Sequence, residues 1–157
     1  MTREEKFMHE AVLLSEKGIK HHEGGPFGCV IVKDNQIIGR GHNQVTSTND
    51  PTAHAEIIAI RDACKHLGTF NLEDCEIYTS CEPCPMCLGA IYWARPKIVY
   101  YANTREDAAD IGFDDSMIYD EISKDLKHRK IQAIHLDSTE AKKIFLEWGC
   151  KKGKIEY

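Results

Sequence analysis

The stretch that most constrains this chain covers residues 81–93 and reads C-E-P-C-P-M-C-L-G-A-I-Y-W. A second short motif, P-T-A-H-A-E, lies upstream at 51–56. Together they supply one imidazole, from His54, and two thiols, from Cys84 and Cys87. Imidazole nitrogen and thiolate sulfur are ligands that zinc accepts. The fold must therefore bring two segments, far apart in the chain, to one cation.

Each motif is expected at the start of a helix. Cys84 and Cys87 are three residues apart, so they share one face of a helix. Free N–H groups and the positive end of the helix dipole favour thiolates in the first turn. Three protein ligands leave one tetrahedral position open for water, which distinguishes a catalytic zinc site from a structural one. We predict one Zn²⁺ per subunit, held by His54, Cys84 and Cys87.

A carboxylate completes the pattern. Glu56 lies two residues after His54. At that spacing it need not ligate the same ion, but it can reach a water molecule beside it. Its predicted role is general base, and then general acid toward a leaving nitrogen. These residues favour a zinc-dependent hydrolase. The pair of motifs, H-x-E and P-C-x-x-C, resembles the signature of the zinc deaminases, and this resemblance implies removal of an amino group from a nucleobase.

Composition limits the partners. A length of 157 residues predicts one domain, residues 1–157, with 151–157 as a C-terminal tail. No apolar run approaches the roughly 20 residues of a membrane span, and the N-terminus lacks the apolar core of a signal peptide. We therefore expect a cytoplasmic protein without a membrane partner. The net charge of −5 favours a small substrate and disfavours nucleic acid.

Hydrophobic periodicity predicts an α/β fold. Helices are expected at 3–20, 50–67, 84–93 and 138–148, and strands at 27–33, 36–41, 75–79, 97–101 and 131–136. The first two strands flank Asp34 and Asn35 and predict an antiparallel hairpin. The later strands alternate with helices, which predicts crossover connections and a partly parallel sheet.

Several motifs resemble one family. They read G-G-P-F-G at 24–28, N-D-P-T-A-H-A-E at 49–56, G-A-I-Y-W-A-R-P at 89–96 and G-F-D-D-S at 112–116. With H-x-E and P-C-x-x-C they resemble bacterial guanine deaminases of the cytidine-deaminase-like zinc deaminase superfamily. The resemblance implies a three-layer α/β/α sandwich around a five-stranded mixed sheet. It also implies a homodimer that hydrolyses guanine to xanthine and ammonia.

The same resemblance implies roles for individual residues. Glu56 and Asp115 are the expected catalytic carboxylates. The expected substrate-binding residues are Phe27, Asn43, Ala55, Trp93 and Tyr157. The C-terminal segment is expected to cross to the partner subunit and close its active site with Tyr157.

At four of these positions a purely structural role is an alternative to the functional one. Phe27 starts a strand and fits a hydrophobic core, and Trp93 fits packing under the sheet. Asn43 fits a turn, and the pair at 114–115 fits the cap of a following helix. Experiment or structure has to separate these interpretations from the functional ones.

Other functions remain open. Cys81, Cys84 and Cys87 read C-x-x-C-x-x-C, the start of an iron–sulfur run, but position 91 is Ile where that run needs a further Cys. A structural zinc module could use Cys81 as its fourth ligand, which leaves Glu56 without a role. Within catalysis, a tRNA adenosine deaminase or another nucleobase or nucleoside deaminase shares both metal motifs. A tRNA enzyme should carry a basic surface.

Overall fold

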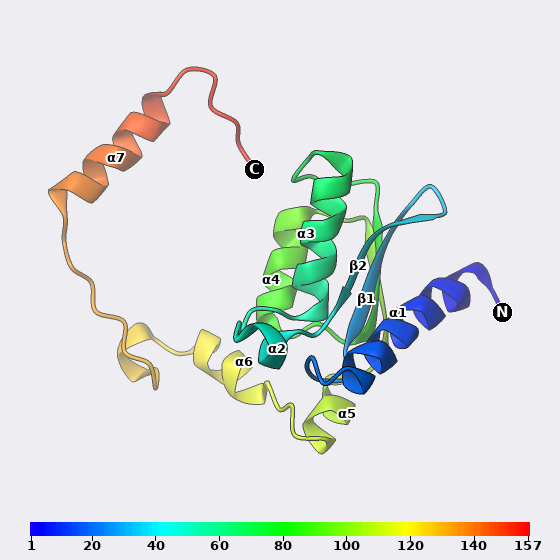
Figure 1. Cartoon of the computed structure of the whole chain (residues 1–157). Coiled ribbons are helices and arrows are strands. Elements are labelled where there is room, and N and C mark those ends of the chain that lie inside the picture. Colours follow the sequence, from blue (N-terminus) through cyan, green and yellow to red (C-terminus); the bar gives the residue numbers. More distant parts are fainter. The chain divides into compact units, whose positions relative to one another are not determined.

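A four-stranded mixed sheet organises the first part of the computed structural model, which describes all 157 residues (Figure 1). The chain divides into two compact units, Met1–Ser116 and Met117–Tyr157, and each is described by itself. The strands are β1 Gly28–Lys33, β2 Gln36–His42, β3 Glu76–Cys81 and β4 Ile98–Asn103. None of the helices has both the length and the apolar character needed to cross a membrane.

The sheet order is β2-β1-β3-β4. β1 pairs antiparallel with both β2 and β3, while β3 and β4 run parallel. Asp34 and Asn35 both have positive φ, of 48° and 62°, as a tight hairpin turn between twisted strands requires. The hairpin and the parallel crossover predicted from the sequence are confirmed.

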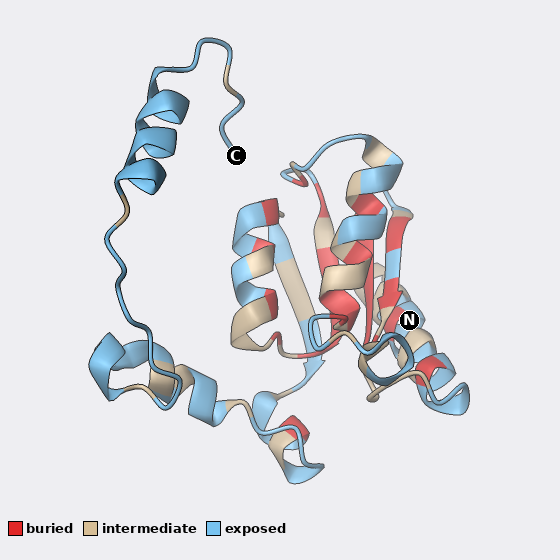
Figure 2. Cartoon of the chain, turned by 60° about the vertical axis from the view of Figure 1, so that its left-hand side comes forward, coloured by how far each residue is buried: buried red, intermediate tan, exposed pale blue.

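Helices cover both faces of this sheet. The helices of the first unit are α1 Arg3–Lys20, α2 Val45–Thr48, α3 Ala55–Leu67, α4 Pro85–Ala94 and α5 Arg105–Asp110. Successive β1 side chains point to opposite faces, so Val30 and Val32 pack with α1 while Cys29 and Ile31 join the core beneath α3 and α4. Figure 2 shows the buried residues concentrated in the sheet and on the helix faces turned toward it.

The start of α3 differs from the sequence prediction. The helix begins at Ala55 with His54 as its N-cap, whereas the periodicity predicted a start near Asp50. The Asp50 carboxylate accepts hydrogen bonds from the Thr52 N–H at 2.8 Å and from its hydroxyl at 2.7 Å. This local turn competes with helix formation. As a result His54, and not Asp50, occupies the helix N-terminus.

A glycine lets α3 approach β2 closely. A Cβ atom at Gly41 would lie 2.2 Å from the carbonyl oxygen of Ala55, far inside contact distance. The backbone of β2 therefore packs directly against the first turn of α3. This contact fixes the position of His54 and Glu56 relative to the sheet.

The strand predicted at residues 131–136 falls in the second unit, where the structure has no strand. The elements of this unit are α6 Ser116–Ser123, which begins at the end of the first unit, a short 3₁₀ helix Leu126–His128, and α7 Thr139–Cys150. Residues 131–136 form no strand, so the sheet has four strands where the sequence predicted five. Ile131, Ile134 and Leu136 are 88%, 77% and 83% exposed. An isolated apolar stretch has no neighbouring backbone to complete its hydrogen bonds.

Candidate metal and catalytic site

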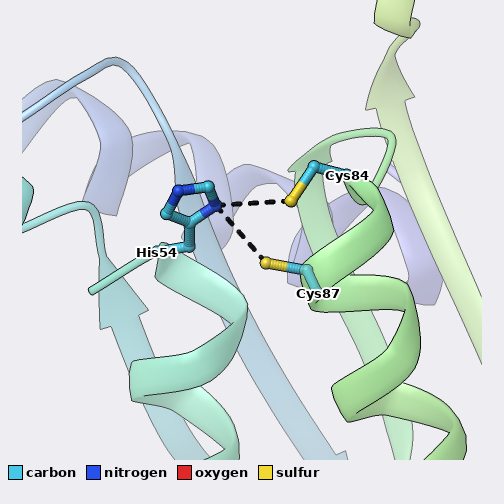
Figure 3. A group of neighbouring side chains, drawn as sticks. All are labelled: His54, Cys84 and Cys87. Carbon is cyan, nitrogen blue, oxygen red and sulfur yellow. Dashed lines mark hydrogen bonds between the residues drawn. The ribbon is translucent and has the colours of Figure 1, made fainter. Parts of the chain in front are cut away.

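Two helix N-termini meet at the predicted zinc ligands. His54 is the N-cap of α3 and Cys84 is the N-cap of α4, with Pro85 at the first helical position. Cys87 lies in the first turn of α4 and is fully buried. Figure 3 shows the three side chains pointing toward one another. Each ligand therefore lies where helix N–H groups and dipoles favour negative charge.

The distances between donor atoms fit zinc. The Nδ1 atom of His54 lies 3.5 Å from the Sγ of Cys84 and 3.5 Å from the Sγ of Cys87. The three ligand atoms all lie within 4.8 Å of one another. Tetrahedral zinc, with Zn–N near 2.0–2.1 Å and Zn–S near 2.3 Å, separates N from S by about 3.5 Å and S from S by about 3.8 Å. One borderline-soft cation therefore fits this donor set.

The electrostatics of the ligands suit a cation as well. The hydrogen bond from the Cys87 thiol, helped by His54, lowers the pKa of Cys84 to about 4 against the opposing effect of burial. In the same bond Cys87 keeps its proton, and the pKa of its thiol is raised. The hydrogen bond to Cys84 raises the pKa of His54. Binding of a metal ion displaces the remaining thiol proton.

Glu56 lies in the wall of the same site. Its side chain is buried, with only 6% of the residue exposed, and the Thr79 hydroxyl donates a hydrogen bond to Oε1 at 3.0 Å. Burial raises the pKa of Glu56 and outweighs the opposing effect of its hydrogen bonds, among them the one from the Thr79 hydroxyl. A carboxyl group with a raised pKa beside a metal site is suited to proton transfer.

Asn43 borders the site from the end of β2. The residue is 5% exposed, and its Oδ1 accepts hydrogen bonds from the N–H groups of Gly25 at 3.3 Å and Val45 at 3.1 Å. The next N–H, of Gln44, donates to the carbonyl of Ala53 at 3.0 Å, directly before His54. Asn43 thus lies beside the start of α3.

An aromatic pair and an acidic residue lie in the same unit. The rings of Phe27 and Phe113 meet edge to face, with centroids 4.9 Å apart and planes at 86°. Asp114 accepts a hydrogen bond from the N–H of Ser116 at 2.9 Å and so caps the following helix. Burial, and then the negative charge of Cys84, raises the pKa of Asp115. The pKa of Asp115 therefore depends in part on the charge of Cys84. Asp114, by contrast, hydrogen-bonds to the first residue of α6.

The remaining predicted substrate-binding residues, Ala55, Trp93 and Tyr157, lie in three different parts of the chain. Ala55 is fully buried as the first residue of α3, where its N–H has no partner within the helix. Trp93 is 63% exposed near the C-terminal end of α4, about two turns beyond Cys87. Tyr157 belongs to the second unit and is 68% exposed. Substrate contacts for these three residues stay predictions.

Sequence reasoning missed two residues, Thr79 and Phe113, that contact predicted site residues. Thr79 is a polar residue in a fully buried stretch of β3, and that contrast was the available signal. Phe113 lies within G-F-D-D-S, but only the fold brings its ring to Phe27.

Comparison with known proteins identifies the family. Residues 1–103 match the model of the cytidine and deoxycytidylate deaminase zinc-binding region. The chain is 56% identical over 153 residues to the guanine deaminase of Bacillus subtilis (strain 168), and 98% of each chain is covered. It is similar to the solved structure of guanine deaminase from Bacillus subtilis with a TM-score of 0.94, again over 98% of each chain.

Two further relatives match about two thirds of the chain. The tRNA-specific adenosine deaminase of Streptococcus pyogenes serotype M18 is 46% identical over 101 residues, which is 64% of this chain and 63% of that protein. A solved guanine deaminase from Nitrosomonas europaea is 33% identical with a TM-score of 0.66, over 69% of this chain and 63% of that one. The chain therefore belongs to the guanine deaminases, within the family that carries the cytidine and deoxycytidylate deaminase zinc-binding region.

Proposed function

We propose that this protein hydrolyses guanine to xanthine and ammonia. The observation that carries the proposal is the His54, Cys84 and Cys87 donor set beside the buried Glu56, in a chain 56% identical over 98% of its length to a guanine deaminase. A zinc ion bound by these ligands supplies a Lewis acid that lowers the pKa of a water molecule. The remaining chemistry comes from the protein's own side chains.

Glu56 moves the protons. Its carboxylate accepts a proton from the attacking water and delivers a proton to the leaving nitrogen. A carbon–oxygen bond forms at the ring carbon that carries the amino group, the carbon–nitrogen bond breaks, and ammonia leaves. The Thr79 hydroxyl donates a hydrogen bond to Oε1 and holds the carboxylate in place for both transfers. Asp115 is a second acidic group for the departing amine.

The purine is held by groups from several elements. In this proposal the Asn43 amide hydrogen-bonds to a polar edge of the ring. Phe27 and Trp93 contact its flat faces, and the Ala55 N–H is a further donor. Aromatic side chains suit a flat substrate because they bury much area at low entropic cost.

The assay is ammonia release from a panel of substrates. The zinc-loaded protein should release ammonia from guanine, and little or none from adenine or from tRNA. Release from tRNA but not from guanine would instead support the adenosine deaminase function, for which the 46% identity to the Streptococcus pyogenes enzyme is the specific observation. Guanosine in the same panel shows whether a ribose is tolerated.

The proposal includes a homodimer with exchanged C-terminal segments. Exposed apolar residues of α7 support it: Ile144, Phe145 and Leu146 are 60%, 82% and 70% exposed. In the first unit, β4 is an edge strand, and an apolar groove is lined by Leu88, Ile91, Tyr92, Arg95, Pro96 and Val99. A second copy of the chain would cover both surfaces, and residues 131–136 would supply the fifth strand. The single domain predicted for residues 1–157 is then completed by the partner.

Subunit mixing tests this exchange. Light scattering should give a dimer, and removal of residues 153–157 should reduce guanine turnover while zinc stays bound. Mixing that truncated protein with Glu56→Gln protein should restore activity if the tail acts on the partner, because one of the two sites in the mixed dimer is then intact. No recovery despite confirmed subunit exchange contradicts action in trans. A cytoplasmic location stays part of the proposal and agrees with seven free cysteines.

A further inference from the structure

A histidine–carboxylate pair outside the catalytic centre lies next to Asn43. Glu23 follows the end of α1, and His42 is the last residue of β2. The Nε2 of His42 contacts Oε2 of Glu23, and the two side chains are only 12% and 31% exposed. Neither residue is a zinc ligand, and neither belongs to the motifs that predicted the site.

Glu23 is anchored on three sides. Its N–H donates to the Gly18 carbonyl at 3.0 Å, at the end of α1. Its carbonyl accepts hydrogen bonds from the Ser47 N–H at 3.1 Å and the Thr46 hydroxyl at 3.0 Å, both in α2. With the His42 contact, Glu23 joins α1, α2 and the end of β2. This arrangement fixes the backbone on both sides of Asn43.

The anchored backbone sets the orientation of the Asn43 amide. Its Oδ1 accepts from the N–H of Gly25, two residues after Glu23, and from the N–H of Val45, three residues after His42. A Cβ atom at Gly24 would lie 2.1 Å from that oxygen, so the loop backbone packs directly against the amide. Two N–H donors require an oxygen at this position, and a flipped amide would place its NH₂ group against them.

The other end of the amide faces outward. The hydrogen bonds of the Asn43 side chain involve Oδ1, and its Nδ2 has no partner in the protein. Every fully buried side-chain nitrogen or oxygen does have a partner, so Nδ2 is not fully buried. The NH₂ group is therefore accessible to a ligand. It presents donors only, so it selects a substrate edge that carries an acceptor, such as a carbonyl oxygen or an unprotonated ring nitrogen.

We propose that Glu23 and His42 are positioning residues that hold the Asn43 amide with its NH₂ group toward the substrate. This inference rests on the proposed function, in which Asn43 contacts the purine. The pair touches neither the substrate nor the metal ligands. Its effect is on substrate binding and on discrimination between ring edges, and not on proton transfer.

Kinetics of matched variants test the proposal. Glu23→Ala and His42→Ala should each raise KM for guanine about tenfold, the effect of one weakened hydrogen bond, with kcat and zinc content nearly unchanged. The double variant should be no worse than either single variant, because the two residues act as a unit. His42→Gln keeps a donor for Glu23 and should restore KM. His9→Ala and Glu10→Ala, exposed on α1, are the controls.

Specificity gives a second kinetic readout. 7-Deazaguanine lacks the N7 acceptor of guanine, and 2-aminopurine lacks the carbonyl oxygen. Wild-type protein should discriminate strongly against the analogue that lacks the acceptor of Asn43, and Glu23→Ala should lose most of that discrimination. A merely structural role predicts lower stability with unchanged ratios between substrates.

NMR of the zinc-loaded protein provides a test that needs no turnover. The side-chain NH₂ group of Asn43 should give a pair of sharp proton signals away from random-coil positions in wild-type protein, and broadened signals shifted toward random-coil positions in Glu23→Ala. Glu23→Ala also carries the test if His42→Ala fails to fold, since the Glu23 side chain is the more exposed of the two. An unchanged amide signal together with an unchanged KM would overturn the positioning role.

The variant Asn43→Ala distinguishes a failure of the positioning inference from a failure of the substrate role of Asn43. If Asn43→Ala raises KM but Glu23→Ala and His42→Ala do not, the positioning inference is wrong and the proposed function stands. If Asn43→Ala leaves guanine kinetics unchanged, the substrate role of Asn43 is wrong and the positioning inference falls with it. Wild-type protein that releases no ammonia from guanine would contradict the function itself.

Discussion

Replacement of Glu56 by glutamine separates proton transfer from every other property of the site. Glutamine has nearly the same shape, and its amide oxygen can still accept the Thr79 hydrogen bond that spans 3.0 Å in the native site. The amide cannot accept a proton and pass it on. The three zinc ligands remain, so the variant should bind one zinc ion per subunit and stay folded.

The expected loss of activity follows from the number of proton transfers. One general acid–base group contributes about 10²–10⁴-fold to a rate. In the proposed mechanism Glu56 serves two transfers, so kcat should fall by at least about 10⁴-fold, or roughly 5.5 kcal/mol of barrier. The unfolding midpoint should not fall, because a buried ionised carboxylate is costly and only 6% of this residue is exposed.

The assay is ammonia release from guanine by variant protein of confirmed zinc content. Glu10→Gln makes the same chemical change at an exposed position of α1 and should keep full activity. Turnover by zinc-loaded Glu56→Gln within tenfold of wild type would refute the assignment of Glu56 as the proton carrier. Loss of zinc from the variant would show instead that Glu56 supports the metal.

Three further predictions concern the metal, the substrate and stability. Cys87→Ala should lose zinc and much of the soluble yield, because metal binding and folding are coupled; elemental analysis that finds full zinc would contradict the ligand assignment. Asn43→Ala should lower kcat/KM for guanine by at least tenfold while zinc content stays normal. Burial alone raises the pKa of Glu76, but hydrogen bonds from Arg3 and Tyr78 outweigh it and lower that pKa from 4.5. Ionised Glu76 therefore stabilises the fold fully above pH 4.5, and this stabilisation is lost as the pH falls through the lowered pKa of the folded state. Glu76→Gln should cost about 1–2 kcal/mol at pH 7 in thermal melts, and progressively less as the pH falls below 4.5.

The sequence by itself determined the metal chemistry and the elements that carry it. Cys84 and Cys87 could be predicted as ligands from local spacing, because residues three apart on a helix share a face. His54 and Glu56 were predicted from their residue types within the H-x-E motif, whereas their approach to the cysteines depends on the fold. The hairpin at Asp34 and Asn35 was equally local, because the residues of a tight turn specify its geometry.

The prediction of a strand at 131–136 was wrong because strand formation depends on a distant part of the chain and not on local spacing. An apolar stretch has the composition of a strand, but a strand exists only when a neighbouring backbone completes its hydrogen bonds. Neither the amino-acid composition nor the hydrophobic periodicity of the chain indicates which segment would be that neighbour. The four-stranded sheet of the single chain provides none for these residues.

Only the tertiary structure decided which residues surround Glu56 and Asn43. Thr79 reaches Glu56 from 23 positions further along the chain, and Glu23 reaches His42 from 19 positions away. The Asn43 amide takes its orientation from two backbone N–H groups that only the folded loops bring together. A ligand type follows from a residue's own chemistry, whereas the direction in which an amide points depends on neighbours that the linear sequence does not place beside it.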